Sequence, residues 1–136
     1  MPQYRGTEGQ LISVREAKVF TKRHQSSRED VIRAGKNYVE AEFFGLETFQ
    51  QLLKECGGKP VGFRVYYGVR EEDHENDEPV VCIEGDGKGK STPRLIIVPV
   101  DAQGVDLSGL MSVGGHKDMP ADGKVLVNGP ICPRSC

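Results

Sequence analysis

The sequence predicts an α+β fold, with two or three helices packed on one face of a small antiparallel sheet of three to four strands. Residues 61–70 and 94–101 are rich in apolar and β-branched residues, and the first of these segments alternates with period two, as a half-buried strand does. Residues 14–34 and 46–56 place apolar side chains at helical spacing. With 136 residues the chain has the length of one domain, since single domains cluster near ~100–150 residues. These observations favour a layer of helices over a layer of strands.

The first helical segment begins at a capping box. The Ser13 hydroxyl can accept a hydrogen bond from an early backbone N–H, and Glu16 can reach back to the cap. Val19 and Phe20 are available for the buried side of this helix. Residues 26–27 are two serines that would divide the segment, so that one helix or two both fit residues 14–34. The second helical segment, residues 46–56, ends at a pair of glycines.

The expected sheet contains residues 38–44, 61–70 and 94–101, with 80–84 as a possible fourth strand. The apolar side of the 61–70 strand carries Val61, Phe63, Val65, Tyr67 and Val69. The opposite side carries Gly62, Arg64, Tyr66, Gly68 and Arg70. We expect the apolar side to face the helices and the opposite side to face solvent.

A single domain of residues 1–136 is expected, with three less regular parts. Residues 1–11 form a flexible arm, residues 71–93 a charged hairpin insertion and residues 109–136 a loop-rich tail. Residues 71–78 hold six acids in eight positions, and their mutual repulsion favours a solvated loop.

The composition and the first residues restrict the cellular compartment and the classes of partner that we expect. The first residues lack the apolar segment of a secretory signal, and no apolar run approaches the ~18 residues of a membrane span. A cytoplasmic location and no membrane partner are therefore expected. The 18 basic and 20 acidic residues give a net charge of −2, which argues against nucleic-acid binding because such domains usually carry a basic excess.

The expected binding surface is formed by Arg64, Tyr66 and Arg70 on the outer side of the sheet. Arginine and tyrosine are the residue types that anchor protein interfaces. The sequence thus predicts a non-enzymatic binding or self-association module, whose partner is itself or another protein. An ordinary solvent-facing sheet surface is the simpler interpretation. Neither a Gly-x-Ser-x-Gly nor a His-Glu-x-x-His motif occurs, so no catalytic residue is predicted, and an enzyme with an unrecognised site stays open.

His116, Cys132 and Cys136 form the one set of residues suited to a transition metal. Imidazole and thiolate groups bind zinc, but a closed zinc site needs four ligands and no fourth is evident. The two cysteines could instead form a disulfide with a redox role or stay free thiols, while Cys56 and Cys82 fit buried thiols. We therefore expect no cofactor, with zinc as the alternative.

The order of several segments resembles a family of short uncharacterised bacterial proteins of the Bacteroidetes type. The matching stretches are Ile12–Ala17, Glu42–Gly45, Val61–Gly68, Leu95–Leu107 and Cys132–Cys136, with an FFG turn, a strand ending in YYG and a terminal CPxxC. The chain departs from the family pattern by a longer charged insertion around residues 71–93. The resemblance implies the boundaries of the fold and a purpose for the terminal cysteine pair, and it implies no particular reaction.

Overall fold

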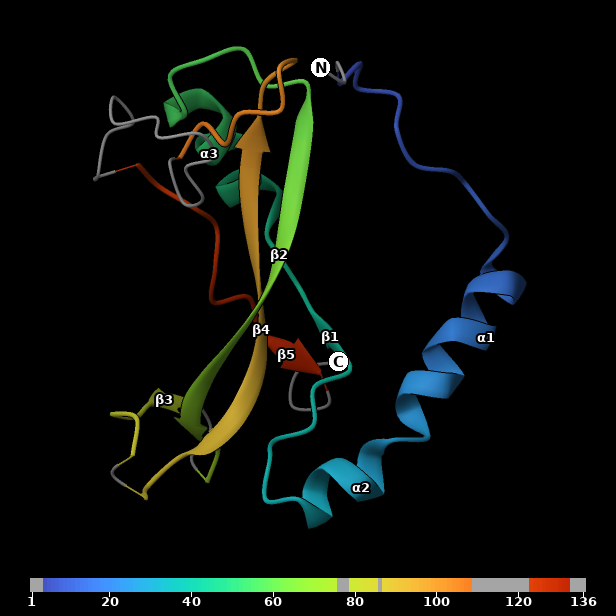
Figure 1. Ribbon diagram of the computed structural model, residues 1–136, viewed down its shortest axis with the longest axis vertical. Coiled ribbons are helices and arrows are strands. Elements are labelled where there is room, and N and C mark those ends of the chain that lie inside the picture. The colour runs from blue at the N-terminus through green and yellow to red at the C-terminus, as the bar shows by residue number, and fades with distance from the viewer. Residues whose placement is uncertain (1–3, 76–78, 86, 109–122, 133–136) are drawn as a thin grey trace. The chain divides into compact units, whose positions relative to one another are not determined.

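The computed structural model describes residues 4–75, 79–85, 87–108 and 123–132, and it confirms the α+β class (Figure 1). The helices of the described residues are α1 (Val14–Gln25), α2 (Arg28–Arg33) and α3 (Leu46–Glu55). The strands are β1 (Ala41–Glu42), β2 (Gly62–Asp73), β3 (Val80–Val81), β4 (Lys90–Val100) and β5 (Ile131–Cys132). They form a three-stranded sheet in the order β3-β2-β4 and a two-stranded sheet of β1 and β5, both antiparallel.

The described residues fall into two compact units. Unit 1 takes those within Met1–Gln10, Phe44–Tyr66 and Leu95–Gly129, and unit 2 takes those within Leu11–Phe43, Tyr67–Arg94 and Pro130–Cys136. Helix α3 belongs to unit 1, whereas α1, α2, β1, β3 and β5 belong to unit 2. The long strands β2 and β4 contribute residues to both units.

The predicted capping box starts α1. The Ser13 hydroxyl accepts a hydrogen bond from the backbone N–H of Glu16 at 3.1 Å, which satisfies one of the donors that a helix start leaves open. Helix α1 ends at Gln25 and α2 begins at Arg28, so the segment forms two helices divided at the predicted serine pair.

The predicted burial of α1 is wrong. Val19 and Phe20 are 51% and 65% exposed, and neither α1 nor α2 contains a buried residue. Helix α1 is held at its last turn, where His24 Nε2 lies 2.7 Å from the carbonyl oxygen of Val39 and the His24 ring stacks on Tyr38. Packing of the helices on one face of the sheet is therefore not confirmed.

The segment 38–44 does not form a strand of the main sheet. Only its residues 41–42 are in β1, which pairs with β5 through Ala41 opposite Cys132 and Glu42 opposite Ile131. The partner strand β5 lies in the part of the chain expected to be loop-like. Short-range patterning missed this sheet because each of its strands has two residues and pairs with a segment distant in sequence.

Strand β2 alternates as predicted, but the side expected to be buried is exposed. The exposed side carries Phe63, Val65, Tyr67 and Val69. The inward side carries Arg64, Tyr66, Arg70 and Glu72, the last of them completely buried. The prediction of a solvent-facing surface made by Arg64, Tyr66 and Arg70 is therefore wrong, because these side chains have partners inside their units.

Each unit has a small apolar core. Among its described residues, unit 1 buries the apolar side chains of Leu52, Val98, Pro99, Val100 and Leu126. In unit 2 they are Tyr38, Val39 and Ile131. In unit 1, Leu126 joins β4 through a backbone bridge to Ile97, and the rings of Phe49 and Phe63 lie 4.3 Å apart.

Leu52 is the one buried residue of α3, and its truncation tests the core of unit 1. We expect Leu52→Ala to lower the free energy of unfolding by about 2–5 kcal/mol, the usual cost of removing a buried leucine side chain. Leu46→Ala, on the same helix at a position 70% exposed, serves as the control and should change stability by less than about 1 kcal/mol. Urea denaturation followed by circular dichroism measures both, and equal effects would contradict the described packing of α3.

Candidate binding site

Two of the three predicted binding residues, Arg64 and Tyr66, converge on Asp106 in unit 1. Arg64 Nη1 donates to one carboxylate oxygen of Asp106 at 2.5 Å, and the Tyr66 hydroxyl donates to the other. Asp106 is 3% exposed, so these contacts compensate a buried charge. Burial, followed by the hydrogen bond to Asp106, raises the pKa of Tyr66, which keeps its hydroxyl a donor.

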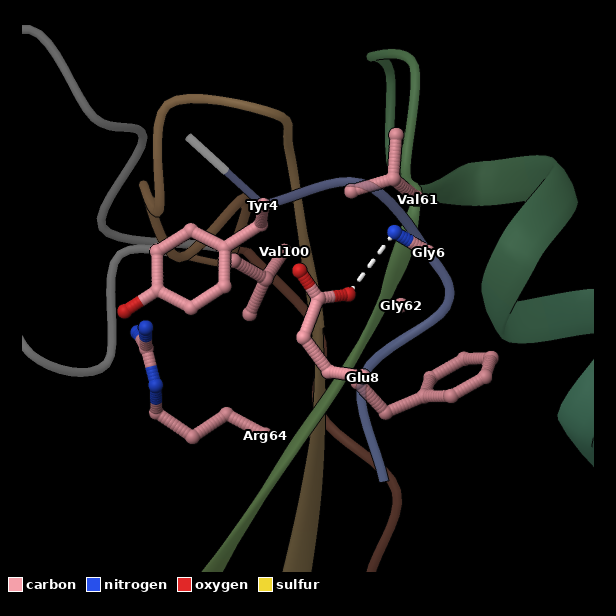
Figure 2. A pocket seen from close by; sticks show the side chains of 8 residues that line it. Tyr4, Gly6, Glu8, Val61, Gly62, Arg64 and Val100 are labelled. Carbon is pink, nitrogen blue, oxygen red and sulfur yellow. Dashed lines mark hydrogen bonds between the residues drawn. The ribbon is translucent and has the colours of Figure 1, made fainter. Parts of the chain in front are cut away.

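A cavity of about 440 Å³ lies beside Arg64, within the range of small-molecule pockets (Figure 2). Its lining is Tyr4, Gly6, Glu8, Val61, Gly62, Phe63, Arg64 and Val100.

The expected N-terminal arm supplies one wall of this cavity. Tyr4 N–H donates to the carbonyl of Ala102 at 2.9 Å, and the Arg64 guanidinium lies 5.7 Å from the centre of the Tyr4 ring. The backbone N–H groups of Arg5 and Gly6 each donate to the Glu8 carboxylate at 2.8 Å, as Figure 2 shows for Gly6. Both charged groups of the lining thus have partners within the chain, and the cavity presents a ligand mainly with apolar walls.

The third predicted binding residue, Arg70, belongs to a separate cluster in unit 2. Its Nε donates to Glu72 at 2.6 Å. Arg94 holds the same carboxylate in a bidentate contact, with Nε and Nη2 at 2.7 and 2.8 Å from the two oxygens. His74 Nε2 lies 2.9 Å from Glu72, and Arg94 also pairs with Glu42 at 3.4 Å.

This cluster keeps Glu72 ionised. Burial is the largest single influence on the carboxyl and acts to raise its pKa. The hydrogen bonds from Arg94, Arg70 and His74 outweigh it and lower the pKa of Glu72 from its ordinary 4.5 to about 2. A general acid at neutral pH needs the opposite shift, so Glu72 is not suited to that role.

Sequence reasoning missed Glu72, Arg94 and Asp106. Glu72 could have been found from the sequence, because the period-two alternation of the strand places it on the same side as Arg70, two positions earlier. Asp106 forms an isolated antiparallel bridge with Val100, and no local pattern indicates its contact with β2.

The predicted metal ligands are not brought together in the described part of the chain. His116 and Cys136 lie outside the described residues, and Cys132 is disulfide-bonded. Cys56 and Cys82 are half-buried and are not disulfide-bonded. No group of three or more His, Cys, Asp and Glu side chains suited to a metal ion occurs within residues 4–75, 79–85, 87–108 and 123–132.

Comparison with protein-family models, with curated proteins and with solved structures gives no match for this chain. The resemblance to a bacterial family therefore stays a prediction. None of the described helices combines the length and the apolar character that crossing a membrane requires.

The Glu72 cluster makes a prediction about acid stability. Because the pKa of Glu72 is about 2 in the folded protein, its contribution is complete above about pH 4.5 and is lost as the pH falls toward 2. We expect Glu72→Gln to lower the free energy of unfolding at pH 7 by about 3 kcal/mol, since it removes the bidentate counter-charge of the buried Arg94 and leaves the longer contact with Glu42.

Urea denaturation between pH 7 and pH 2.5 measures this contribution. The difference between wild type and Glu72→Gln should shrink across the acid range. Glu75→Gln, at an exposed position, is the control and should track wild type. A pH-independent difference would show that Glu72 is not held as a carboxylate.

Proposed function

We propose that this protein is a non-enzymatic module that self-associates through the exposed side of β2 in unit 2. The observation that carries the proposal is the exposure of Tyr67 and Val69, which are 92% and 71% exposed on a strand whose alternate side chains point inward. Contiguous apolar surface of this kind marks interaction sites in soluble proteins.

The surface extends from β2 to its neighbour. Asp73 of β2 pairs with Val80 of β3, so Val80 lies on the same side of the sheet as Tyr67 and Val69. We call this surface the β2 outer face: Tyr67, Val69, Glu71 and Asp73 of β2 together with Val80 of β3.

Exposed apolar side chains are concentrated in unit 2. Of the sixteen large hydrophobic side chains exposed among the described residues, twelve belong to unit 2. The four in unit 1 are Tyr4, Leu46, Phe63 and Val65. This imbalance favours unit 2 as the part that a partner covers.

A second copy is the occupant we propose. The net charge of −2 is small, so copies repel one another weakly. The same unit also contains an exposed helix, α1, which carries apolar side chains together with basic ones that complement the acids of the β2 outer face. The partner surface is therefore present in every copy.

The low pKa of Glu72 supports a binding role over a role in acid catalysis. Glu72 and Asp106 are both engaged with arginines, and the low pKa of Glu72 removes it as a proton donor near neutrality.

Val69→Lys tests the proposal. A lysine in the centre of the β2 outer face should convert the associated wild type to a monomer at micromolar concentration, because association would bury an unpaired charge. Leu46→Lys is the matched control, since Leu46 in unit 1 is 70% exposed, and it should leave the association unchanged. Sedimentation velocity measures both, and a wild type that is monomeric up to about 1 mM would refute self-association.

Thiol redox chemistry is a second candidate function, which one observation favours. Cys132 is disulfide-bonded, whereas Cys56 and Cys82 are not. A sulfur in a disulfide is not a thiolate ligand, so this state favours a thiol–disulfide role over zinc binding.

Thiol titration decides between these chemistries. Denatured protein prepared without reductant should show two titratable thiols, rising to four after reduction, and should contain no stoichiometric zinc. Cys82→Ser should lower the first number to one. Four thiols before reduction would eliminate the disulfide, and one zinc ion per chain would favour the metal site instead.

A further inference from the structure

Helix α1 has an exposed apolar side that its own chain leaves uncovered. Val14, Ala17 and Phe20 recur every three residues, which places them along one side of the helix. Val14 is 73% exposed and Phe20 is 65% exposed.

A basic stripe runs beside this apolar side. Arg15, Lys18 and Lys22 have the i, i+3, i+7 spacing of residues that share one side of a helix. With Arg23, the helix has four arginines and lysines against the single acid Glu16. The apolar side of α1 can therefore contact an apolar surface while its basic stripe contacts acidic side chains next to that surface.

The β2 outer face has this composition. Tyr67 and Val69 form its apolar part, and Glu71 and Asp73 follow at alternate positions on the same side. Residues 67–73 span about 20 Å at the rise of an extended strand, and the 12 residues of α1 span about 18 Å. The two surfaces thus agree in length as well as in apolar character and charge.

The helix of the same chain is not available for this contact in the described structure. His24 fixes the last turn of α1 against Val39 and Tyr38, and Phe20 one turn earlier is exposed. Tyr67, Val69 and Val80 of the chain's own β2 outer face are exposed as well, and Glu71 and Asp73 are half-buried. A second copy can satisfy both surfaces at once.

We infer that α1 of one copy lies on the β2 outer face of a second copy, with the stripe of Arg15, Lys18 and Lys22 beside Glu71 and Asp73, and that the second copy returns the same contact. The inference rests on the proposed function and names the partner of the same surface. A reciprocal contact of this kind closes a two-fold dimer and leaves no surface for further copies.

Charge reversal in two separate variants tests the reciprocal contact. Variant A carries Lys18→Glu and Lys22→Glu, and variant B carries Glu71→Lys and Asp73→Lys. Each alone places like charges in both contacts of its homodimer, so we expect its dimer dissociation constant to rise at least about tenfold. An equal mixture of A and B restores opposite charges in both contacts and should form heterodimers close to wild-type affinity.

The outcomes separate the inference from the proposed function. Sedimentation velocity on A, B and their mixture is read beside wild type, with circular dichroism to verify folding. A wild-type dimer with unaffected variants, or with weakened variants that fail to recover on mixing, overturns the α1 contact and leaves self-association intact. A monomeric wild type overturns both, and a monomer that binds anionic phospholipid vesicles through α1 assigns the basic helix to a membrane instead.

A second measurement does not depend on the charge variants folding. Wild type carrying the photo-reactive residue benzoylphenylalanine at position 20 is mixed with isotope-labelled wild type and irradiated. Cross-links from position 20 to residues 67–73 of the labelled chain support the inference. Cross-links confined to the same chain, or directed to unit 1 of the labelled chain, overturn it.

Discussion

The carboxylate of Glu72 is the group on which the arrangement of β2 in unit 2 depends. Removing a carboxylate from water costs several kcal/mol, and a buried pair offsets this cost only with good geometry. Arg94 supplies that geometry through its bidentate contact, and Arg70 adds a further charged donor. Because strand side chains alternate, burial of Glu72 directs Tyr67 and Val69 to the opposite side.

Asp106 has the same effect on β2 in unit 1. It is buried with Arg64 and Tyr66 as its donors, and both donors come from the side of β2 that includes Arg70 and Glu72. Turning the apolar side of β2 inward would carry Arg64 and Glu72 outward and take from Asp106 and Arg94 these counter-charges. The loss would exceed the gain from burying a few valines, since breaking a buried ion pair costs about 3–5 kcal/mol. The polar side of β2 is therefore the internal one in both units.

The parts of the fold that depend on local signals were predictable. The Ser13 cap, the division of residues 14–34 and the helix after Gly45 each follow from side chains within a few positions, and the period of β2 was plain from its sequence. The side of β2 that faces inward was not predictable by hydrophobicity. That choice depends on Asp106 and Arg94, which lie 42 and 22 positions from their partners Arg64 and Glu72.

The predictions for the candidate site were also partly right and partly wrong. Arg64, Tyr66 and Arg70 were recognised by residue type, yet their partners make them internal anchors of two separate clusters. The β1–β5 sheet was beyond local reasoning for a similar reason, because its backbone hydrogen bonds join residues near 41 to residues near 131. The predictions of which side chains are buried failed because burial here depends on distant partners, whereas the helix cap, the helix division and the strand period depend on neighbours and are confirmed.

The buried charges fix which side of β2 is exposed. The small apolar area of that side limits which partners can bind it stably. Burying one such side chain contributes about 1.5–3 kcal/mol, so Tyr67 and Val69 alone do not offset the roughly 4–15 kcal/mol that association costs. A partner has to contribute apolar area of its own, and Val14 and Phe20 of α1 provide it within the same sequence. In a two-fold dimer the contact between helix and strand occurs twice, so the free energy gained from burial is doubled. No further surface of the protein is needed for this gain. The ion pairs that stabilise the interior of β2 thus also explain why its apolar residues are available to another molecule.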